Sequence, residues 1–214
     1  MTKMIYIADP MCSWCYGFGP ELATLLKGIP DISLDIVVGG LRAYNTETMN
    51  DEKRSSMLSH WDKVEEASGL PFTDKAIAAD NFIYDTEPAC RAVVTVRTLA
   101  PHATLTSFYA LQHAFYAEGL DITKADVLAK VCVDVLNESG ISIDRQAFLN
   151  SWASEEIIAA THADFVQTQK WGVTGFPSLV LEIGGKLHLV SSGFTRTEDL
   201  IAQMQALVDQ AIAS

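Results

Sequence analysis

Residues 4–15, MIYIADPMCSWC, decide the fold, because an apolar segment typical of a buried strand ends at Asp9-Pro10 and two cysteines follow it at once. After the pair, apolar residues recur at helical spacing, at Phe18, Leu22, Leu25 and Leu26. Cys12 and Cys15 therefore lie where a strand turns into a helix, and the first of them faces unpaired backbone N–H groups and the positive end of the helix dipole. Both favour the thiolate, the form that attacks disulfides, so we expect Cys12 to be an exposed nucleophile and Cys15 to resolve the mixed disulfide.

The composition is ordinary for a globular protein and excludes some classes of partner. The chain has 214 residues, enough for one large domain or for one domain carrying an insertion. No apolar run approaches the length of a membrane span, and no signal-peptide pattern precedes the first predicted strand, so we expect a cytoplasmic protein without a membrane partner. The formal net charge of −12 argues against nucleic acid as a partner, since nucleic-acid binding needs basic patches.

Two pairs of predicted strands enclose a long helical stretch. The strand pattern occurs at residues 4–8, 32–38, 178–183 and 186–190, the last two joined by a Gly184-Gly185 turn. Between the pairs we expect only helices, at residues 46–67, 87–99, 104–118, from the cap Thr123, and in two pieces over 144–168 with caps at Asp144 and Ser154. A last helix follows the capping-box spacing of residues 195–198 and carries its apolar side to Ile212.

Several other polar residues have a functional and a structural interpretation. Cys90 and Cys132 lie in apolar helical surroundings and fit small buried residues better than reactive ones. Asp9 could transfer a proton at the redox pair, but an aspartate before a helix more often caps the turn. No two histidines stand at a metal-ligand spacing, so we expect no metal site; they are at positions 60, 102, 113, 162 and 188.

A second signal precedes the third predicted strand, in the run Gly172-Val173-Thr174-Gly175-Phe176-Pro177. Proline cannot donate to a strand ladder, and only about one X–Pro bond in twenty is cis in folded proteins, so the residues alone favour a trans proline in a loop. Together with the Cys-x-x-Cys and the helical stretch, however, this run resembles the DsbA family of thioredoxin-fold proteins. The likeness is strongest to its cytosolic, FrnE-like branch of predicted disulfide isomerases, and it covers essentially the whole chain.

The resemblance implies an α/β fold: a thioredoxin-like domain with a large all-helical insertion between its βαβ and ββα halves. Residues 1–44 and 173–214 would form the thioredoxin-like domain, and residues 45–172 the helical insertion. It also implies a cis peptide bond before Pro177, so that the backbone of Phe176 can bind an extended substrate. Ser13 and Trp14, between the cysteines, would contact that substrate, with Trp14 exposed.

The activity implied is that of a thiol–disulfide oxidoreductase or protein-disulfide isomerase acting on disulfide-containing proteins or peptides. No cofactor would be bound, and glutathione is a candidate redox co-substrate. The run from Tyr84 to Arg91 resembles a segment near the active site of related proteins. Arg91 could meet an anionic ligand such as glutathione there, although a solvent-facing helix arginine is the commoner case. In a reducing cytosol the protein would act as a reductase or isomerase more readily than as an oxidant.

Two other functions remain open. A glutathione-dependent transferase or isomerase of the kappa-class and hydroxychromene-carboxylate isomerase type would share the fold and its insertion. Those enzymes carry a serine where this chain has Cys12, and they need no resolving cysteine. A chaperone-like binding protein would use the groove and leave both thiols idle.

Overall fold

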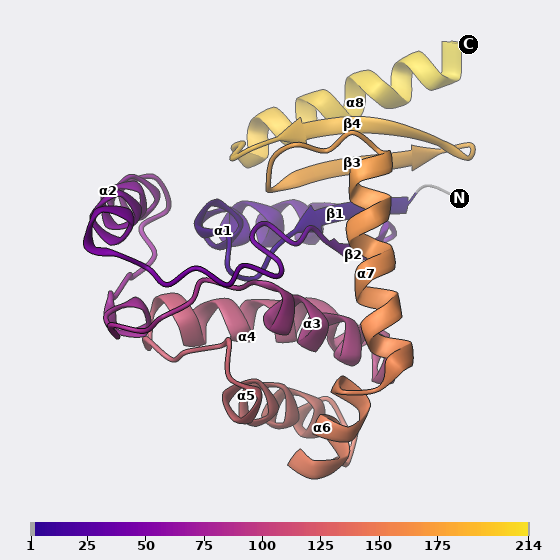
Figure 1. Cartoon of the computed structure of the whole chain (residues 1–214). Coiled ribbons are helices and arrows are strands. Elements are labelled where there is room, and N and C mark those ends of the chain that lie inside the picture. The colour runs from indigo at the N-terminus through magenta and orange to yellow at the C-terminus, as the bar shows by residue number, and fades with distance from the viewer. Residues whose placement is uncertain (1–2, 214) are drawn as a thin grey trace.

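The computed structural model describes residues 3–213, with side chains to residue 210. Residues 1, 2 and 214 of the predicted thioredoxin-like domain, and the predicted apolar side chain of Ile212, therefore lie outside what it describes. A mixed four-stranded sheet with the order β2-β1-β3-β4 runs through the molecule (Figure 1). Its strands are β1 (Lys3–Ala8), β2 (Ser33–Val38), β3 (Ser178–Ile183) and β4 (Lys186–Ser192).

One helix follows β1 and another follows β4, and the remaining helices come between β2 and β3. The flanking helices are α1 (Ser13–Gly28) and α8 (Thr197–Ala213). The helices between the strand pairs are α2 (Asp51–Ser68), α3 (Glu87–Leu99), α4 (Thr104–Tyr116), α5 (Ala125–Glu138), α6 (Arg145–Trp152) and α7 (Glu155–Lys170), with short 3-10 turns at Lys75–Ile77 and Pro101–Ala103. This order confirms the predicted fold class.

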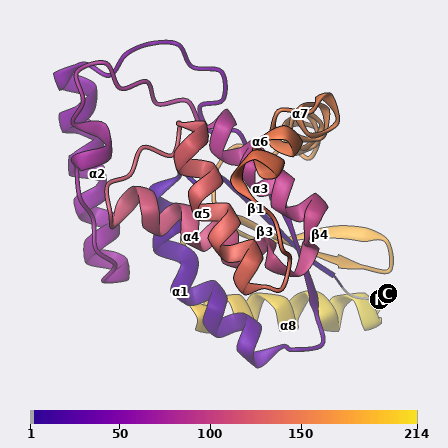
Figure 2. The same ribbon diagram turned by 90° about the horizontal axis from the view of Figure 1, so that it is seen from below.

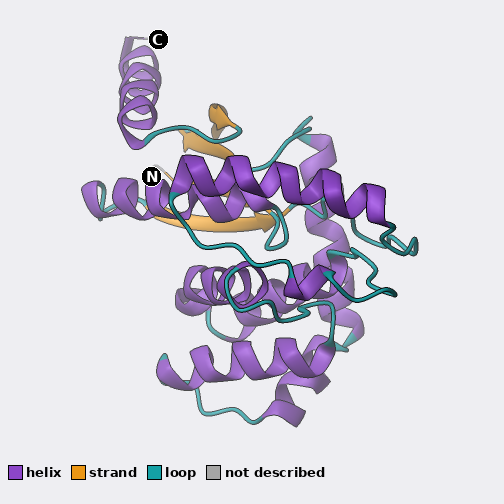
Figure 3. Ribbon diagram, turned by 90° about the vertical axis from the view of Figure 1, so that its left-hand side faces the viewer, coloured by secondary structure: helices purple, strands orange, loops and turns teal. Residues whose placement is uncertain are grey.

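The sheet register places alternate residues of β1 on two different apolar surfaces. Tyr6 pairs with Ile36 of the parallel strand β2 and with Leu179 of the antiparallel strand β3. The face of the sheet that carries Tyr6 packs in the main core, to which α1 and α8 also contribute. These two helices contact one another and lie side by side in Figure 2. The opposite side, with Ile5 and Ile7, forms a smaller cluster, and α7 crosses the strands in Figure 1 and contacts β2. Figure 3 shows the strands gathered in one layer with helices around it.

Two of the predicted helix caps are confirmed and explain why residues 144–168 form two helices. The side chain of Asp144 accepts a hydrogen bond from the N–H of Ala147 and begins α6. The side chain of Ser154 accepts one from Ile157 and begins α7. Each oxygen satisfies a backbone donor that the helix itself leaves unpaired.

Three predicted helix starts are wrong, and each has a local reason. The helix expected from residue 46 begins at Asp51, because the side chain of Asn50 caps it. Thr123 does not cap α5: its hydroxyl donates to Asp121, and the helix begins at Ala125. The capping box of residues 195–198 does not form either, because a carboxylate from another helix takes its place.

That carboxylate is Glu21 of α1. It accepts hydrogen bonds from the backbone N–H of Thr197, at 2.8 Å, and from its hydroxyl, at 2.6 Å. The Thr195 hydroxyl instead donates to the carbonyl group of Gly193. Glu21 also pairs with Arg196, so the start of α8 is fixed to the side of α1. Within residues 3–213, no helix is both long and apolar enough to cross a membrane.

Candidate active site

The turn from β1 into α1 places Cys12 at the N-cap position of the helix. Its backbone is extended, and no side chain donates or accepts a capping hydrogen bond there. The N–H of Cys12 donates to the carbonyl oxygen of Asp9 at 3.0 Å, and its carbonyl oxygen accepts from Tyr16 at 3.1 Å. An N-cap side chain normally accepts hydrogen bonds from the first-turn N–H groups. The Cys12 sulfur therefore occupies the place where a helix favours a negatively charged acceptor.

The two cysteines of the pair have different environments. Cys15 is fully buried, and this burial, together with a hydrogen bond to the Cys12 side chain, raises the pKa of the Cys15 thiol well above its usual range. Cys12 is not the exposed residue that the sequence predicts: it is 7% accessible, because Phe176 lies against it. Its Sγ is 3.7 Å from the Phe176 carbonyl oxygen, and it opens only toward a cavity. All four cysteines of the chain are free thiols.

The loop before β3 brings the second sequence signal to the first. The Phe176–Pro177 peptide bond is cis. The Phe176 ring packs over Gly39 at the end of β2, where an added Cβ would lie 2.1 Å from the ring. A side chain at position 39 would displace this ring, so glycine allows the close packing. The carbonyl group of Phe176 faces Cys12.

Ser13 and Trp14, predicted to contact substrate, both line the cavity. Ser13 is buried, with 7% of its surface accessible. Trp14 is half-buried and not freely exposed, because its ring lies between His60 of α2, at 5.9 Å, and Phe194, at 5.5 Å between centroids. Trp14 therefore forms part of the cavity wall.

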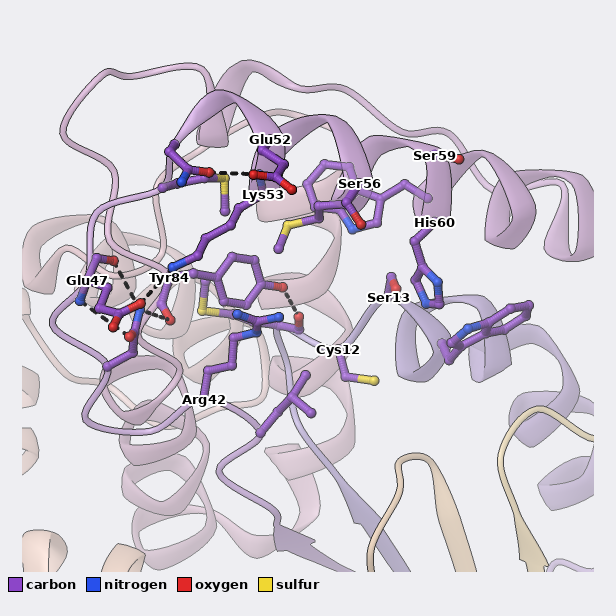
Figure 4. Close-up of a pocket in the computed structure, with 18 of the residues that line it drawn as sticks. Cys12, Ser13, Arg42, Glu47, Glu52, Lys53, Ser56, Ser59, His60 and Tyr84 are labelled. Carbon is purple, nitrogen blue, oxygen red and sulfur yellow. Dashed lines mark hydrogen bonds and ion pairs between the residues drawn. The ribbon is translucent and has the colours of Figure 1, made fainter.

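The cavity in front of Cys12 has a volume of about 920 Å³ (Figure 4). It lies between the start of α1, the loop 41–50 and the first half of α2. Its charged lining consists of three basic side chains and two carboxylates, Arg42, Lys53, Lys63, Glu47 and Glu52. One basic charge is thus in excess here, in a chain whose net charge is −12.

Arg42 and Lys63 are the two basic side chains of this lining without a carboxylate partner among residues 3–210. Lys53, in contrast, pairs with Glu47 at 2.6 Å. The guanidinium of Arg42 lies over the ring of Tyr84, 5.6 Å from the centroid, and Figure 4 shows both beside Cys12. Arg42 is therefore free to bind an anionic group of a ligand in the cavity.

Asp9 is fully buried next to the turn that carries Cys12. Its carboxylate accepts hydrogen bonds from the backbone N–H of Met11, at 2.8 Å, and of Leu41, at 2.7 Å. The thiol of Cys90 donates to it as well, at 3.4 Å. Burial raises the pKa of Asp9, and the hydrogen bonds from Met11 and Leu41 oppose that effect. These contacts fix the turn before Cys12 to the loop after β2, which supports the structural interpretation of Asp9.

Two tyrosines that sequence reasoning missed also bind this turn. The hydroxyl groups of Tyr84 and Tyr116 both donate to the carbonyl oxygen of Met11, the residue before Cys12. The run from Tyr84 to Arg91 was the one local signal for the first of them. Tyr116 ends α4 and carries no local signal, because its partner is a backbone atom 105 residues away.

Arg91 lies outside this cavity, and it is not the solvent-facing arginine that the sequence favoured either, because only 14% of its side chain is accessible. Its guanidinium stacks on Trp152 at 3.6 Å from the ring centroid and pairs with Glu87 at 3.0 Å. Cys90 and Cys132 are fully buried, and burial raises the pKa of both thiols, as expected for structural cysteines. Among the residues that the structure describes, no cluster of three histidine, cysteine, aspartate or glutamate side chains could hold a metal ion.

Known proteins resemble this chain over nearly its whole length. A family model for DSBA-like thioredoxin domains matches residues 5–205. The solved structure of a candidate protein disulfide isomerase from Nitrosomonas europaea is 35% identical, with a TM-score of 0.87 over 98% of both chains. A comparison with curated proteins found no match.

Two more distant structures share the fold. The cytosolic disulfide reductase DsbM from Pseudomonas aeruginosa is 22% identical, with a TM-score of 0.75 over 97% of this chain and 99% of its own. DsbM has also been solved with glutathione. A 2-hydroxychromene-2-carboxylate isomerase is 14% identical, with a TM-score of 0.68 over 99% of this chain and 98% of its own.

Proposed function

The chain belongs to the family of DSBA-like thioredoxin domains, and from this membership we propose that it is a thiol–disulfide oxidoreductase that works through Cys12 and Cys15. One observation carries the proposal. Cys12 occupies the N-cap of α1 and opens to a cavity of about 920 Å³, while Cys15 is buried directly behind it as a neutral thiol. This arrangement separates an attacking sulfur from a resolving one.

The proposed reaction transfers two electrons to the substrate. The Cys12 thiolate attacks one sulfur of a substrate disulfide, a mixed disulfide forms, and the other substrate sulfur leaves as a thiolate. Cys15 then gives its proton to that departing thiolate and attacks the Cys12 sulfur. The Cys12–Cys15 disulfide forms, the second substrate sulfur leaves, and the substrate is reduced while the enzyme is oxidised.

The backbone of Phe176 is the proposed support for the substrate. Its carbonyl oxygen is 3.7 Å from the Cys12 Sγ, so an extended peptide that binds this backbone brings its own disulfide to the nucleophile. Main-chain hydrogen bonds of this kind hold many different sequences. Pro177 follows Phe176 through the cis peptide bond, and Ser13 and Trp14 line the same cavity as Phe176.

Glutathione is the proposed redox co-substrate, and the cytoplasm the proposed location. A protein with this fold, DsbM, is described as a cytosolic disulfide reductase and has been solved with glutathione. Here the excess basic charge of the cavity and the unpaired Arg42 suit a small peptide with carboxylates. In the cytosol the glutathione pool is poised near about −220 to −260 mV, which favours reduction or isomerisation over net oxidation.

Mixed-disulfide trapping tests the proposal. The Cys15→Ser variant cannot resolve the intermediate, so it should accumulate one glutathione per chain when mixed with oxidised glutathione, and intact mass measures this adduct. The Cys12→Ser variant should form no adduct, and the Cys132→Ala variant should retain disulfide reduction as a matched control. Full disulfide reduction by the Cys12→Ser variant would overturn the assignment.

The same Cys12→Ser variant distinguishes the proposed oxidoreductase from the alternative, a glutathione-dependent transferase or isomerase. Those enzymes use a serine at the equivalent position, so their activity should survive the substitution. The likeness to the hydroxychromene-carboxylate isomerase supports only a shared fold. A second, resolving cysteine at Cys15 has no part in that chemistry, which favours the redox assignment.

A further inference from the structure

One backbone carbonyl group in the active-site turn receives two side-chain hydrogen bonds. It is that of Met11, and its oxygen accepts from the hydroxyl of Tyr116 at 2.6 Å and from the hydroxyl of Tyr84. The two hydroxyl oxygens are 3.5 Å apart. Figure 4 shows the Tyr84 hydroxyl directed at the chain beside Cys12. Both lone pairs of this carbonyl are therefore occupied by groups from outside the turn.

Both tyrosines are held rigidly in the core. Tyr116 is fully buried, and 4% of Tyr84 is accessible. The Tyr116 ring stacks on Tyr16 of α1, with centroids 4.9 Å apart and planes 12° from parallel, and it meets Phe115 and Trp61 edge-on. Burial raises the pKa of both tyrosine hydroxyls, so they remain protonated donors throughout the physiological range.

We propose that Tyr84 and Tyr116 are positioning residues for the redox reaction, which act through the Met11 carbonyl group to orient Cys12 and stabilise its thiolate. The inference rests on the proposed function, since it names what tunes the same nucleophile. The carbonyl belongs to the peptide group whose nitrogen is that of Cys12, so fixing it fixes the backbone that carries the sulfur.

The electrostatic reason is local. A carbonyl oxygen carries partial negative charge, and in a buried site that charge would oppose a neighbouring thiolate. Two hydroxyl donors offset this charge. Without the two hydroxyl groups, the Met11 oxygen would form a hydrogen bond with another donor, because a buried carbonyl group without a partner is unfavourable. The first-turn N–H groups of α1 are the nearest backbone donors in sequence, and those are the groups that the thiolate needs.

Hydrogen bonds to Asp9 also fix this turn, so the tyrosine hydroxyl groups are the contacts that can be removed one at a time. The carboxylate of Asp9 accepts a hydrogen bond from the N–H of Met11. The backbone carbonyl oxygen of Asp9 accepts one from the N–H of Cys12. Changing Asp9 would therefore disturb several contacts at once. Replacing either tyrosine by phenylalanine removes one hydroxyl group and keeps the ring packing.

Alkylation of Cys12 by iodoacetamide at pH 7, in a chain carrying Cys15→Ser, measures the thiolate directly. We expect Tyr84→Phe and Tyr116→Phe each to slow this alkylation by about three- to tenfold, the range of a single hydrogen bond. In chains with both cysteines, the equilibrium with glutathione should move toward the Cys12–Cys15 disulfide by a similar factor, because the reduced form has lost stabilisation.

Tyr109→Phe is the matched control. Tyr109 is also on α4 and donates its hydroxyl to α1, but to the carbonyl of Gly19, at 3.3 Å and away from the cysteines. This variant should alkylate at the wild-type rate. If Tyr84→Phe and Tyr116→Phe lower only the free energy of unfolding, and leave both the alkylation rate and the glutathione equilibrium unchanged, the proposal is wrong.

The design keeps the two claims separate. Either single variant suffices if the other does not fold, because both remove a donor from the same oxygen. A wild-type chain that alkylates at Cys12 but reduces no disulfide would overturn the proposed function. The tyrosine effect on alkylation would still be measurable in that chain.

Discussion

Cys12 and Cys15 are three residues apart, yet the first opens to a cavity and the second is sealed in the core. The sequence predicts the buried position of Cys15, one turn into the helix, but not that Phe176 covers Cys12, because that contact joins residues 164 positions apart. The tyrosine donors to Met11 could not be predicted in the same way. Tyr84 and Tyr116 meet a backbone atom across 73 and 105 residues, and no side-chain pattern records such a contact.

Asp9→Asn should destabilise the protein. The Asp9 carboxylate accepts the N–H of Met11 with one oxygen and the N–H of Leu41 with the other. An asparagine offers only one oxygen, so one N–H would face the amide nitrogen. We expect urea denaturation at pH 7 to show a loss of about 1–3 kcal/mol in the free energy of unfolding.

The control is Asp35→Asn, whose exposed ion pair with Lys3 should be worth no more than about 1 kcal/mol. This pair of variants also separates the two interpretations of Asp9. Unchanged stability together with slow disulfide exchange in Asp9→Asn would favour a proton-transfer role.

Arg42→Gln should weaken the preference for anionic substrates. The wild-type cavity has one excess basic charge, and Arg42, like Lys63, has no ion-pair partner among residues 3–210. We expect kcat/KM for oxidised glutathione to fall by about two- to fivefold, with little change for the cationic disulfide cystamine. Lys27→Gln removes an exposed charge at the far end of α1 and should change neither. Equal losses for both disulfides would contradict the assignment of Arg42.

At the level of elements, two caps within one segment were predicted correctly, the local cap Asn50 of α2 was missed, and the cap of α8 from another segment could not be predicted. Asp144 and Ser154 bind N–H groups three residues ahead, so sequence spacing identifies them. The start of α8 depends on Glu21, 176 residues earlier, so the capping-box pattern at 195–198 was misleading. The strands were placed well because their apolar residues and the Gly184-Gly185 turn are local signals.

Glu21→Gln should loosen the start of α8 in a pH-dependent way. Partial burial tends to raise the pKa of Glu21, but the hydrogen bonds from Thr197 and Arg196 outweigh it and lower the pKa. A lowered pKa in the folded state means that the ionised carboxylate stabilises the fold above its unfolded pKa, near about 4.3. The stabilisation is lost as the pH falls through the folded pKa.

We therefore expect Glu21→Gln to cost about 1 kcal/mol at pH 7, the usual value of a helix cap, and nothing at a pH below the folded pKa. Urea denaturation at both pH values measures the difference. A cost that stays constant as the pH falls would show that the charge of Glu21 has no part in capping α8.

At the scale of the whole molecule, a cluster of aromatic rings joins the inserted helices to α1, which begins directly after Cys12. Trp61 of α2 and Phe115 of α4 contact one another, and both contact Tyr116, which stacks on Tyr16 of α1. The main apolar core runs without a break from the sheet into these helices. These ring contacts could not be predicted, because the four residues come from three separate helices.

The continuous core leads to an expectation for unfolding. Residues 45–172 were predicted as a helical insertion, and they share apolar contacts with α1 and the sheet. We expect helix content and tryptophan fluorescence to be lost in one coincident urea transition. Two separated transitions would show that residues 45–172 fold independently of the sheet.

The reduction potential of the Cys12–Cys15 pair, measured by maleimide labelling in graded glutathione buffers, tests the central claim most directly. The account predicts that an intramolecular disulfide forms, with a potential between those of thioredoxin and protein disulfide isomerase, about −270 to −180 mV. If no intramolecular disulfide forms in any buffer, the redox assignment is contradicted, and Cys12 must serve a reaction that has no need of Cys15.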